Sequence, residues 1–91
     1  MDVLEKQPAD LLDFNVRFDR WLPSNDKITT VEAIVDVPAE VNIESLQYSG
    51  QTVTVWISGG LTGKTYKVTV TVATDVGRIK ESEFKLRVRE L

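Results

Sequence analysis

A glycine cluster is the part of this 91-residue chain that most resembles a chemical site. In the stretch SGGLTGKT, Gly59, Gly60 and Gly63 precede Lys64 and Thr65. Glycine-rich loops that end in Gly-Lys-Thr can cradle phosphates, but only where a strand leads into the loop and a helix follows it. The elements on either side of the loop therefore decide whether it binds a nucleotide.

The residues around the cluster favour a corner over a phosphate site. A phosphate-binding loop requires glycine at position 58, where this chain has Ser58. Residues 66–72 alternate with period two and are rich in Val and Thr, which predicts a strand and leaves no helix N-terminus for a phosphate. We expect Gly59, Gly60 and Gly63 to turn the backbone between two strands.

The composition excludes most other catalytic chemistry. The chain has no cysteine and no histidine, which removes disulfides, thiolate metal sites, the commonest general base and the commonest transition-metal ligand. Asp75 and its neighbouring acids form one turn without the dense set of carboxylates that calcium requires. We therefore predict that the protein is not an enzyme, with no catalytic residues, no cofactor and no metal.

The charge of the chain bears on its partners. The formal net charge is -3, so no excess of Lys and Arg can neutralise phosphates, and no apolar run is long enough to span a bilayer. We predict that the protein has neither a nucleic-acid nor a membrane partner. We also predict that it folds in a cytoplasm. Residues 1–50 hold ten acids and four bases, whereas residues 51–91 hold four acids and seven bases. Either acidic and basic strands pair within one sheet, or two charged poles favour head-to-tail association.

Alternation of apolar and polar residues predicts an all-β domain over residues 13–91. Turn signals separate the extended segments, and no helical period is sustained, which indicates a small antiparallel β-sandwich of six to seven strands. Residues 1–12 carry charges without a period and indicate an N-terminal arm. Ile79 is out of phase with Phe84 and the apolar residues after it, which predicts a bulge or a phase change between residues 79 and 84. The predicted strands cover residues 14–18, 27–37, 42–48, 52–57, 66–72 and the segment after Gly77.

Tyr66 begins the strand after the glycine loop. In immunoglobulin-like sandwiches, a tyrosine near the start of the penultimate strand bonds its hydroxyl to the backbone of the preceding corner. Such a bond satisfies a buried polar group and fixes the crossover. We expect Tyr66, with Gly59, Gly60 and Gly63, to form a structural corner.

Trp56 is the best candidate for an interaction with a partner. It lies on the strand face opposite Val53, Val55 and Ile57, so it projects outward beside Thr54 if those three fill the core. Tryptophan is enriched at the centres of interfaces. Either a partner or a second copy covers Trp56, or the N-terminal arm folds over it through Val3 and Leu4 or through Leu11 and Leu12. Trp21, which precedes a turn, is expected to plug an open end of the sandwich.

Four basic residues project from the solvent-facing sides of the last two strands. They form either a solvated face, which also discourages edge pairing, or half of a joint with an acidic partner. The four residues are Lys67, Lys85, Arg87 and Arg89.

Two resemblances extend this interpretation. The stretch TYKVTVTVATDVG at 65–77 resembles the penultimate strand and hairpin of bacterial immunoglobulin-like and polycystic-kidney-disease-type modules. Nearly the whole chain resembles the small virion proteins of tailed bacteriophages that are described as fibre-tail adaptor or tail structural proteins. Its most specific part is VWISGG at 55–60, with Gly63, Tyr66 and TDVGR at 74–78, coupled to the opening DF at 13–14 and WL at 21–22.

The second resemblance implies a non-enzymatic virion component that contacts other phage structural proteins. It would act as an assembly or adaptor module in the tail or head-tail region after assembly in the bacterial cytoplasm. It would form a homo-oligomer on the particle and could be a monomer in isolation. A carbohydrate-binding or adhesive immunoglobulin-like module remains the alternative, because exposed Trp and Tyr side chains can stack on sugars.

Overall fold

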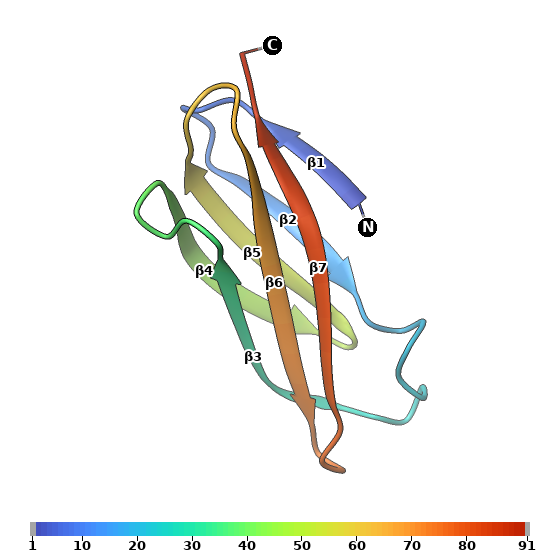
Figure 1. The fold of residues 1–91 in the computed structure, drawn as a ribbon. Coiled ribbons are helices and arrows are strands. Elements are labelled where there is room, and N and C mark those ends of the chain that lie inside the picture. The colour runs from blue at the N-terminus through green and yellow to red at the C-terminus, as the bar shows by residue number, and fades with distance from the viewer. Residues whose placement is uncertain (1, 91) are drawn as a thin grey trace.

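The computed structural model describes residues 2–90, and within them the chain forms seven strands and no helix (Figure 1). No helix of the described part could therefore cross a membrane. Met1 and Leu91, which the predicted arm and domain include, lie outside the described residues. The strands are β1 (Asp2–Lys6), β2 (Leu12–Arg17), β3 (Ile28–Val35), β4 (Val41–Ser49), β5 (Thr52–Gly59), β6 (Thr65–Thr74) and β7 (Ile79–Val88).

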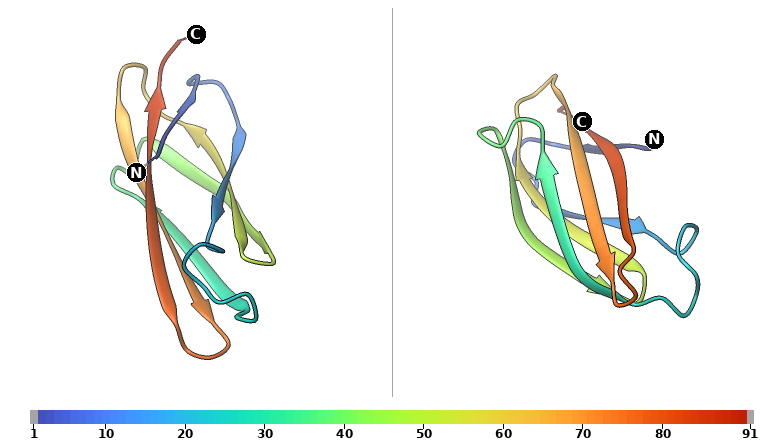
Figure 2. Two further views of the ribbon diagram at one scale, coloured as in Figure 1. Left: turned by 90° about the vertical axis from the view of Figure 1, so that its right-hand side faces the viewer. Right: turned by 60° about the horizontal axis from the view of Figure 1, so that its bottom comes forward.

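The strands form two sheets that pack face to face (Figure 2). One sheet has four strands in the order β1-β7-β6-β3, and the other has three strands in the order β2-β5-β4. All neighbouring strands are antiparallel except β1 and β7, which are parallel. The molecule is an elongated sandwich that measures 41 × 20 × 18 Å.

The core lies between the sheets and comes from the alternation in the sequence. Every second residue of β5 and β6 is buried, because successive side chains of a strand point to opposite faces. Phe14 of β2 meets Phe84 of β7 across the core, with ring centroids 5.9 Å apart. The fully buried aliphatic residues of the central strands are Val53, Val55, Ile57, Val68, Val70 and Val72.

The N-terminal segment differs from the predicted arm. Residues 2–6 form β1, which pairs in parallel with β7 from Asp2 opposite Phe84 to Lys6 opposite Val88. The segment therefore belongs to the four-stranded sheet rather than projecting as a tail. Its inward positions include Lys6, which is 1% exposed. A lysine at a buried position hides the alternation that would have marked a strand.

The predicted bulge in the last strand is also wrong. Pairing between β6 and β7 continues without a shift from Ala73 opposite Ile79 to Thr65 opposite Arg87. Ile79 simply lies on the outward face, where it is 75% exposed. The structure instead shifts register in β3 between Ile28 and Thr30, and in β4 between Ile43 and Ser45.

Candidate interaction surfaces

The glycine corner joins β5 to β6 and closes one end of the sandwich. Gly59, Gly60 and Gly63 all have positive φ, which other residues rarely adopt. The Gly60 amide donates to the Glu40 carbonyl at 2.8 Å, and the Gly63 amide donates to the Val88 carbonyl at 2.8 Å. Because β6 follows directly as a strand, the corner lacks the helix N-terminus that a phosphate loop requires.

Tyr66 lies beneath this corner and is 1% exposed. Its hydroxyl accepts a hydrogen bond from the Leu61 amide at 2.9 Å and donates one to Oε1 of Glu40 at 2.7 Å. Burial raises the pKa of Tyr66. The hydrogen bond from Tyr66, assisted by Lys64 at 3.1 Å, lowers the pKa of Glu40. One hydroxyl thus joins the β5–β6 corner to the turn before β4.

Lys6 forms a second anchor at the same end of the molecule, and sequence analysis missed it. Its Nζ donates to the carbonyls of Gln7 at 2.6 Å, Gly59 at 2.6 Å and Pro8 at 3.4 Å. Burial lowers the pKa of this amine. The bond to Gly59 ties the end of β1 to the end of β5, and the other two bonds fix the turn that follows Lys6. No signal in the sequence marks such a lysine, because its acceptors are backbone atoms.

Trp56 lies half-buried on the outer face of the three-stranded sheet, on the same face as Thr54. A shallow hollow beside the ring is lined by Leu11, Glu44, Ser45 and Gln47. Val3 and Leu4 do not reach this face, because β1 belongs to the other sheet. Polar pairs surround the ring: the Thr54 hydroxyl donates to Oδ1 of Asn15 at 2.8 Å, and the Ser58 hydroxyl donates to Glu44. We define the Trp56 face as Trp56 and Thr54 together with the lining of the hollow, Leu11, Glu44, Ser45 and Gln47.

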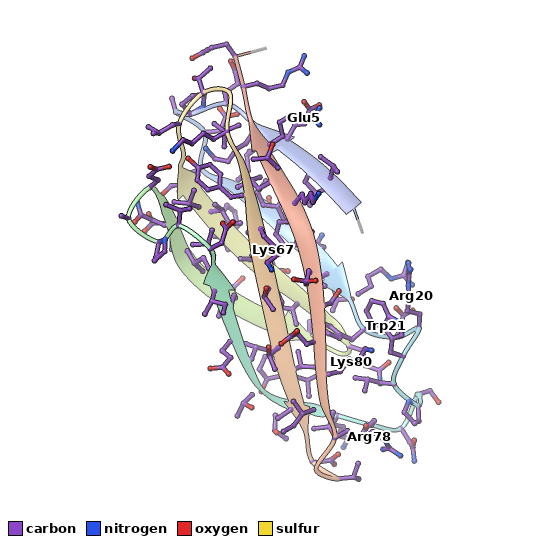
Figure 3. The ribbon with its side chains drawn as sticks, in the orientation of Figure 1. Glu5, Arg20, Trp21, Lys67, Arg78 and Lys80 are labelled. Carbon is purple, nitrogen blue, oxygen red and sulfur yellow. The ribbon has the colours of Figure 1, made fainter. Side chains whose placement is uncertain are left out.

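The predicted basic residues lie on the opposite side of the sandwich: Lys67 on β6 (Figure 3), Lys85 and Arg87 on β7, and Arg89 just after β7. Lys67 and Lys85 face each other directly across the two strands, and Arg87 follows on the same face. Lys67 pairs with Glu83 at 3.3 Å, whereas Arg89 pairs with Glu5 of β1 at 3.3 Å. We define Lys67, Lys85 and Arg87 as the basic face. The structure does not bring it together with the Trp56 face.

Ion pairs link the acidic first half of the chain to the basic second half. Besides Glu5 with Arg89, Glu40 pairs with Lys64, and Asp26 pairs with Arg78, each at 3.1 Å. Asp26 is buried, so Arg78 compensates a carboxylate that has left water. These ion pairs form within one molecule, so the opposite charges of the two halves of the chain partly compensate each other internally.

Trp21 lies at the edge between β2 and β7, near the end of the sandwich opposite the glycine corner (Figure 3). Its ring contacts Phe18 edge-on at 5.7 Å between centroids, yet 43% of the residue is exposed. Arg20 and Lys80 both lie over the ring, at 5.4 Å and 5.2 Å from its centroid. No local pattern in the sequence indicates that Lys80, 59 positions away, meets Trp21.

The described residues hold no cluster of three or more acids that could bind a metal ion. Asp75, the one acidic turn considered for calcium, accepts a long hydrogen bond of 3.4 Å from the Lys27 amide.

The comparisons with known proteins agree with this fold and with the suspected family. The chain is similar to the solved structure described as "Solution structure of the PKD domain from KIAA 1837 protein", with 20% identity and a TM-score of 0.51. The alignment covers 98% of this chain and 79% of that chain, which confirms the immunoglobulin-like fold and nothing further. None of the curated protein sequences matches the chain. The family profile described as "Podophage GP4 fiber-tail adaptor protein gp77" matches residues 6–87. This protein therefore belongs to the podophage GP4 fiber-tail adaptor family.

Proposed function

We propose that this chain is a non-catalytic adaptor that holds two different protein partners at once in the tail of a podophage virion. Membership of the fiber-tail adaptor family supports a role at the junction of fibre and tail. Assembly would take place in the bacterial cytoplasm, which accords with a chain that has no cysteine to oxidise.

The observation that carries this proposal is the placement of the two candidate surfaces. The Trp56 face belongs to the three-stranded sheet, and the basic face belongs to the four-stranded sheet. Surfaces on opposite sides of a thin sandwich can be occupied together without a clash. An adaptor requires this arrangement, whereas a single-ligand module requires one surface.

The chemistry of the two faces predicts different partners. The Trp56 face offers an aromatic ring within polar side chains, Glu44 among them, which suits a protein surface that buries the ring. The basic face places Lys67 directly opposite Lys85, and like charges that face each other across strands destabilise a sheet. Glu83 compensates Lys67, whereas Lys85 forms no ion pair within the described residues. An acidic partner would relieve that repulsion. We therefore assign the acidic partner to the basic face.

The experiment is a binding assay with purified tails and purified fibres of the phage that encodes the chain. Trp56→Ala should lose one of the two components and retain the other. The double charge reversal Lys85→Glu with Arg87→Glu should show the opposite pattern, more strongly at low salt. Lys27→Glu, an exposed reversal outside both faces, is the control. Loss of both components by each variant, or of neither by either, would contradict the two-surface proposal.

We also propose that the isolated chain is a monomer that oligomerises on the particle, and that it binds neither nucleic acid nor membrane. Its net charge of -3 and the absence of a long apolar segment support the second statement. Mass measurement in solution and on isolated tails tests the first.

A sugar ligand is the second candidate for the Trp56 face. The ring lies beside a hollow lined by polar Glu44, Ser45 and Gln47, a combination that can stack on and hydrogen-bond a glycan. A glycan array probed with the wild-type chain and with Trp56→Ala separates the two candidates. Glycan binding that Trp56→Ala abolishes, without loss of the protein partners, would assign this face to sugars.

A further inference from the structure

We propose that the free edge of β7 beside Trp21 binds an extended segment of a partner protein as an added strand. The segment would carry one acidic and one apolar residue, two positions apart. This inference rests on the proposed adaptor function for the nature of the partner, a tail or fibre protein. It concerns a third surface, separate from the Trp56 face and the basic face.

The backbone of β7 is open at this edge. Antiparallel pairing bonds every second residue to the neighbouring strand. The Val88 amide donates to the Lys64 carbonyl at 2.9 Å, so the backbone N–H and C=O groups of even-numbered residues in β7 point toward β6. The Arg89 amide donates to the Lys6 carbonyl at 3.0 Å, so the backbone groups of odd-numbered residues point toward the β1 side. Because β1 pairs only with residues 84–88, and no other described strand joins that edge, the backbone of Glu81 points to an uncovered position.

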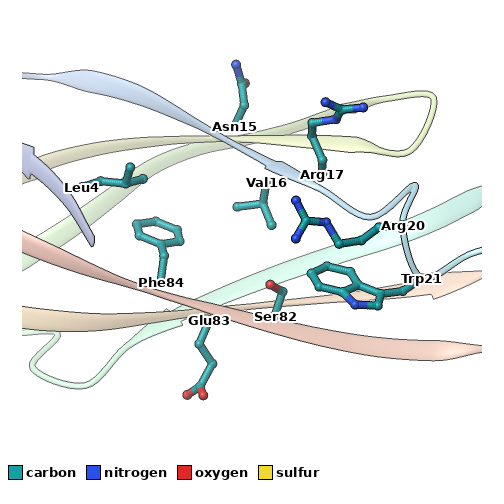
Figure 4. A pocket seen from close by; sticks show the side chains of 9 residues that line it. All are labelled: Leu4, Asn15, Val16, Arg17, Arg20, Trp21, Ser82, Glu83 and Phe84. Atoms are coloured by element: carbon teal, nitrogen blue, oxygen red, sulfur yellow. The ribbon is translucent and has the colours of Figure 1, made fainter. Parts of the chain in front are cut away.

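A hollow lies directly inside this edge, and polar residues such as Arg20 and Ser82 line it as well as apolar ones. It has a volume of about 140 Å³, and Leu4, Val16 and Phe84 project into it from three different strands (Figure 4). Glu83 points away from the hollow in the same view and pairs with Lys67 on the outer face. The apolar part of the hollow, formed by Leu4, Val16 and Phe84, can therefore receive about one side chain of an added strand.

Two cations lie next to the hollow. Arg20 and Lys80 both lie over the exposed ring of Trp21, and neither forms an ion pair within the described residues. Two like charges near one ring repel each other, and a carboxylate close to either would reduce the repulsion. The positive charge of Arg20 and Lys80 next to the hollow thus favours an acidic side chain on the added strand.

The spacing of the two features follows from the period of a strand. Lys80, Ser82 and Phe84 all point to the inner side of β7, so the cations and the hollow lie along one row. Inward side chains of an added strand also recur every second residue. An acidic residue beside Lys80 and an apolar residue in the hollow are therefore two positions apart. Outward positions would be neutral, because Glu81 lies on that side.

The occupant is a partner segment rather than β1 of a second copy. In this chain β1 is already paired with its own β7, and three carbonyls hold its Lys6. Releasing β1 for exchange would break its pairing with β7 and the bond from Lys6 to the Gly59 carbonyl. Strand addition to an exposed edge is a known mode of peptide recognition in which the backbone supplies affinity and alternate pockets supply specificity.

The test is an NMR titration of the full chain with the synthetic peptides acetyl-TTETITT-amide and acetyl-TTITETT-amide, which fit a parallel and an antiparallel added strand. At least one should bind at or below about 1 mM, shift the backbone amides of residues 79–83 and slow hydrogen exchange at Glu81. Replacing the peptide's Glu with Lys should weaken binding about tenfold or more. Shifts confined to other residues, or no binding by either peptide, would overturn the proposal.

Protein variants supply matched controls. Glu81→Pro removes the free amide without removing a bond to β6 and should abolish binding, whereas Glu81→Gln keeps the amide and the binding. Lys80→Glu should weaken binding about tenfold, and Lys27→Glu, with the same change in net charge, should not. If Glu81→Pro fails to fold, the pair Lys80→Glu and Lys27→Glu decides: equal binding by the two overturns the proposal.

The outcomes separate this inference from the proposed function. Peptide binding at the edge, together with failure of the chain to bind tails or fibres, would remove the adaptor function and keep the site. If Lys80→Glu and Glu81→Pro still bind tails and fibres as the wild type does, the proposal that this edge is an adaptor surface is overturned. A concentration-dependent dimer that Glu81→Pro abolishes would assign the edge to a second copy and overturn the partner segment.

Discussion

Glu40 and Tyr66 lie 26 residues apart in the sequence and share a hydrogen bond of 2.7 Å between Oε1 and the phenolic hydroxyl. The carbonyl of the same Glu40 accepts the Gly60 amide at 2.8 Å. Glu40, in the turn before β4, therefore bonds both to Tyr66 beneath the glycine corner and to Gly60 within it. This double contact connects the two sheets where they meet at one end.

We expect Tyr66→Phe to lower the free energy of unfolding by about 0.5 to 1.5 kcal/mol, because the buried hydroxyl loses its bonds to Leu61 and Glu40. Denaturant unfolding measures the change. Tyr48→Phe is the control, since the exposed Tyr48 hydroxyl makes one bond of 3.2 Å to the Thr29 carbonyl, and a smaller loss is expected. An equal loss in both variants would contradict a special role for the corner.

Glu40 should make stability depend on acidity. The Tyr66 bond holds its folded-state pKa below the ordinary value of 4.5, so the unfolded chain takes up the proton first as the pH falls. Its contribution is complete above 4.5 and is lost as the pH falls through the lower, folded pKa. Thermal unfolding between about pH 3 and pH 6 should therefore show a weaker acid dependence in Glu40→Gln than in the wild type.

The Tyr66→Phe background provides the control for that measurement. Because the Tyr66 bond is the largest cause of the lowered pKa of Glu40, Glu40→Gln should change the acid dependence less in this background. An identical change in both backgrounds would show that Tyr66 is not the cause.

Lys6→Met should destabilise the protein by about 1 to 3 kcal/mol, because it leaves the Gln7 and Gly59 carbonyls without their shared donor. Chemical unfolding of the variant measures the effect. The exposed Lys27→Met should stay within about 0.5 kcal/mol of the wild type. A neutral result for Lys6→Met would mean that the removal of a buried charge offsets the lost bonds.

Gly60→Ala should cost more stability than Gly63→Ala, although both glycines have positive φ. A Cβ at position 60 would lie 2.7 Å from Cγ2 of Val88, whereas a Cβ at position 63 meets nothing within 4 Å. The backbone strain common to both is on the order of 1 kcal/mol, and the clash adds to it at position 60 only. Paired melting temperatures measure the difference, and equal values would contradict the clash.

The parts of the fold that follow strict alternation were predictable. Val53, Val55 and Ile57 mark β5, and Tyr66, Val68, Val70 and Val72 mark β6, because a half-buried strand must alternate. β4 was harder to interpret, since its register shift moves the inward side from Ile43 to Leu46. A shift of this kind breaks the period without any residue type that signals it.

The parts that depend on contacts between distant residues were not predictable. Ile79 suggested a bulge because an exposed isoleucine at an edge looks like a misplaced core residue. β1 was missed because Lys6 takes an inward position that only backbone carbonyls make tolerable. Arg20, Trp21 and Lys80 carry no local pattern, and only the pairing of β7 brings the lysine to the ring. Sequence pattern thus locates strands, whereas surfaces between strands require the tertiary fold.

The parallel pairing of β1 with β7 also determines how the molecule would bear a mechanical load. A pull on β1 through its N-terminal end and on β7 through its C-terminal end acts along two strands that run in the same direction. The two strands would then be drawn past each other, so the hydrogen bonds between Asp2–Lys6 and Phe84–Val88 would be stressed in shear, all together rather than one after another. Lys6, at the end of this contact, would add its bond to the Gly59 carbonyl of β5 to the resistance.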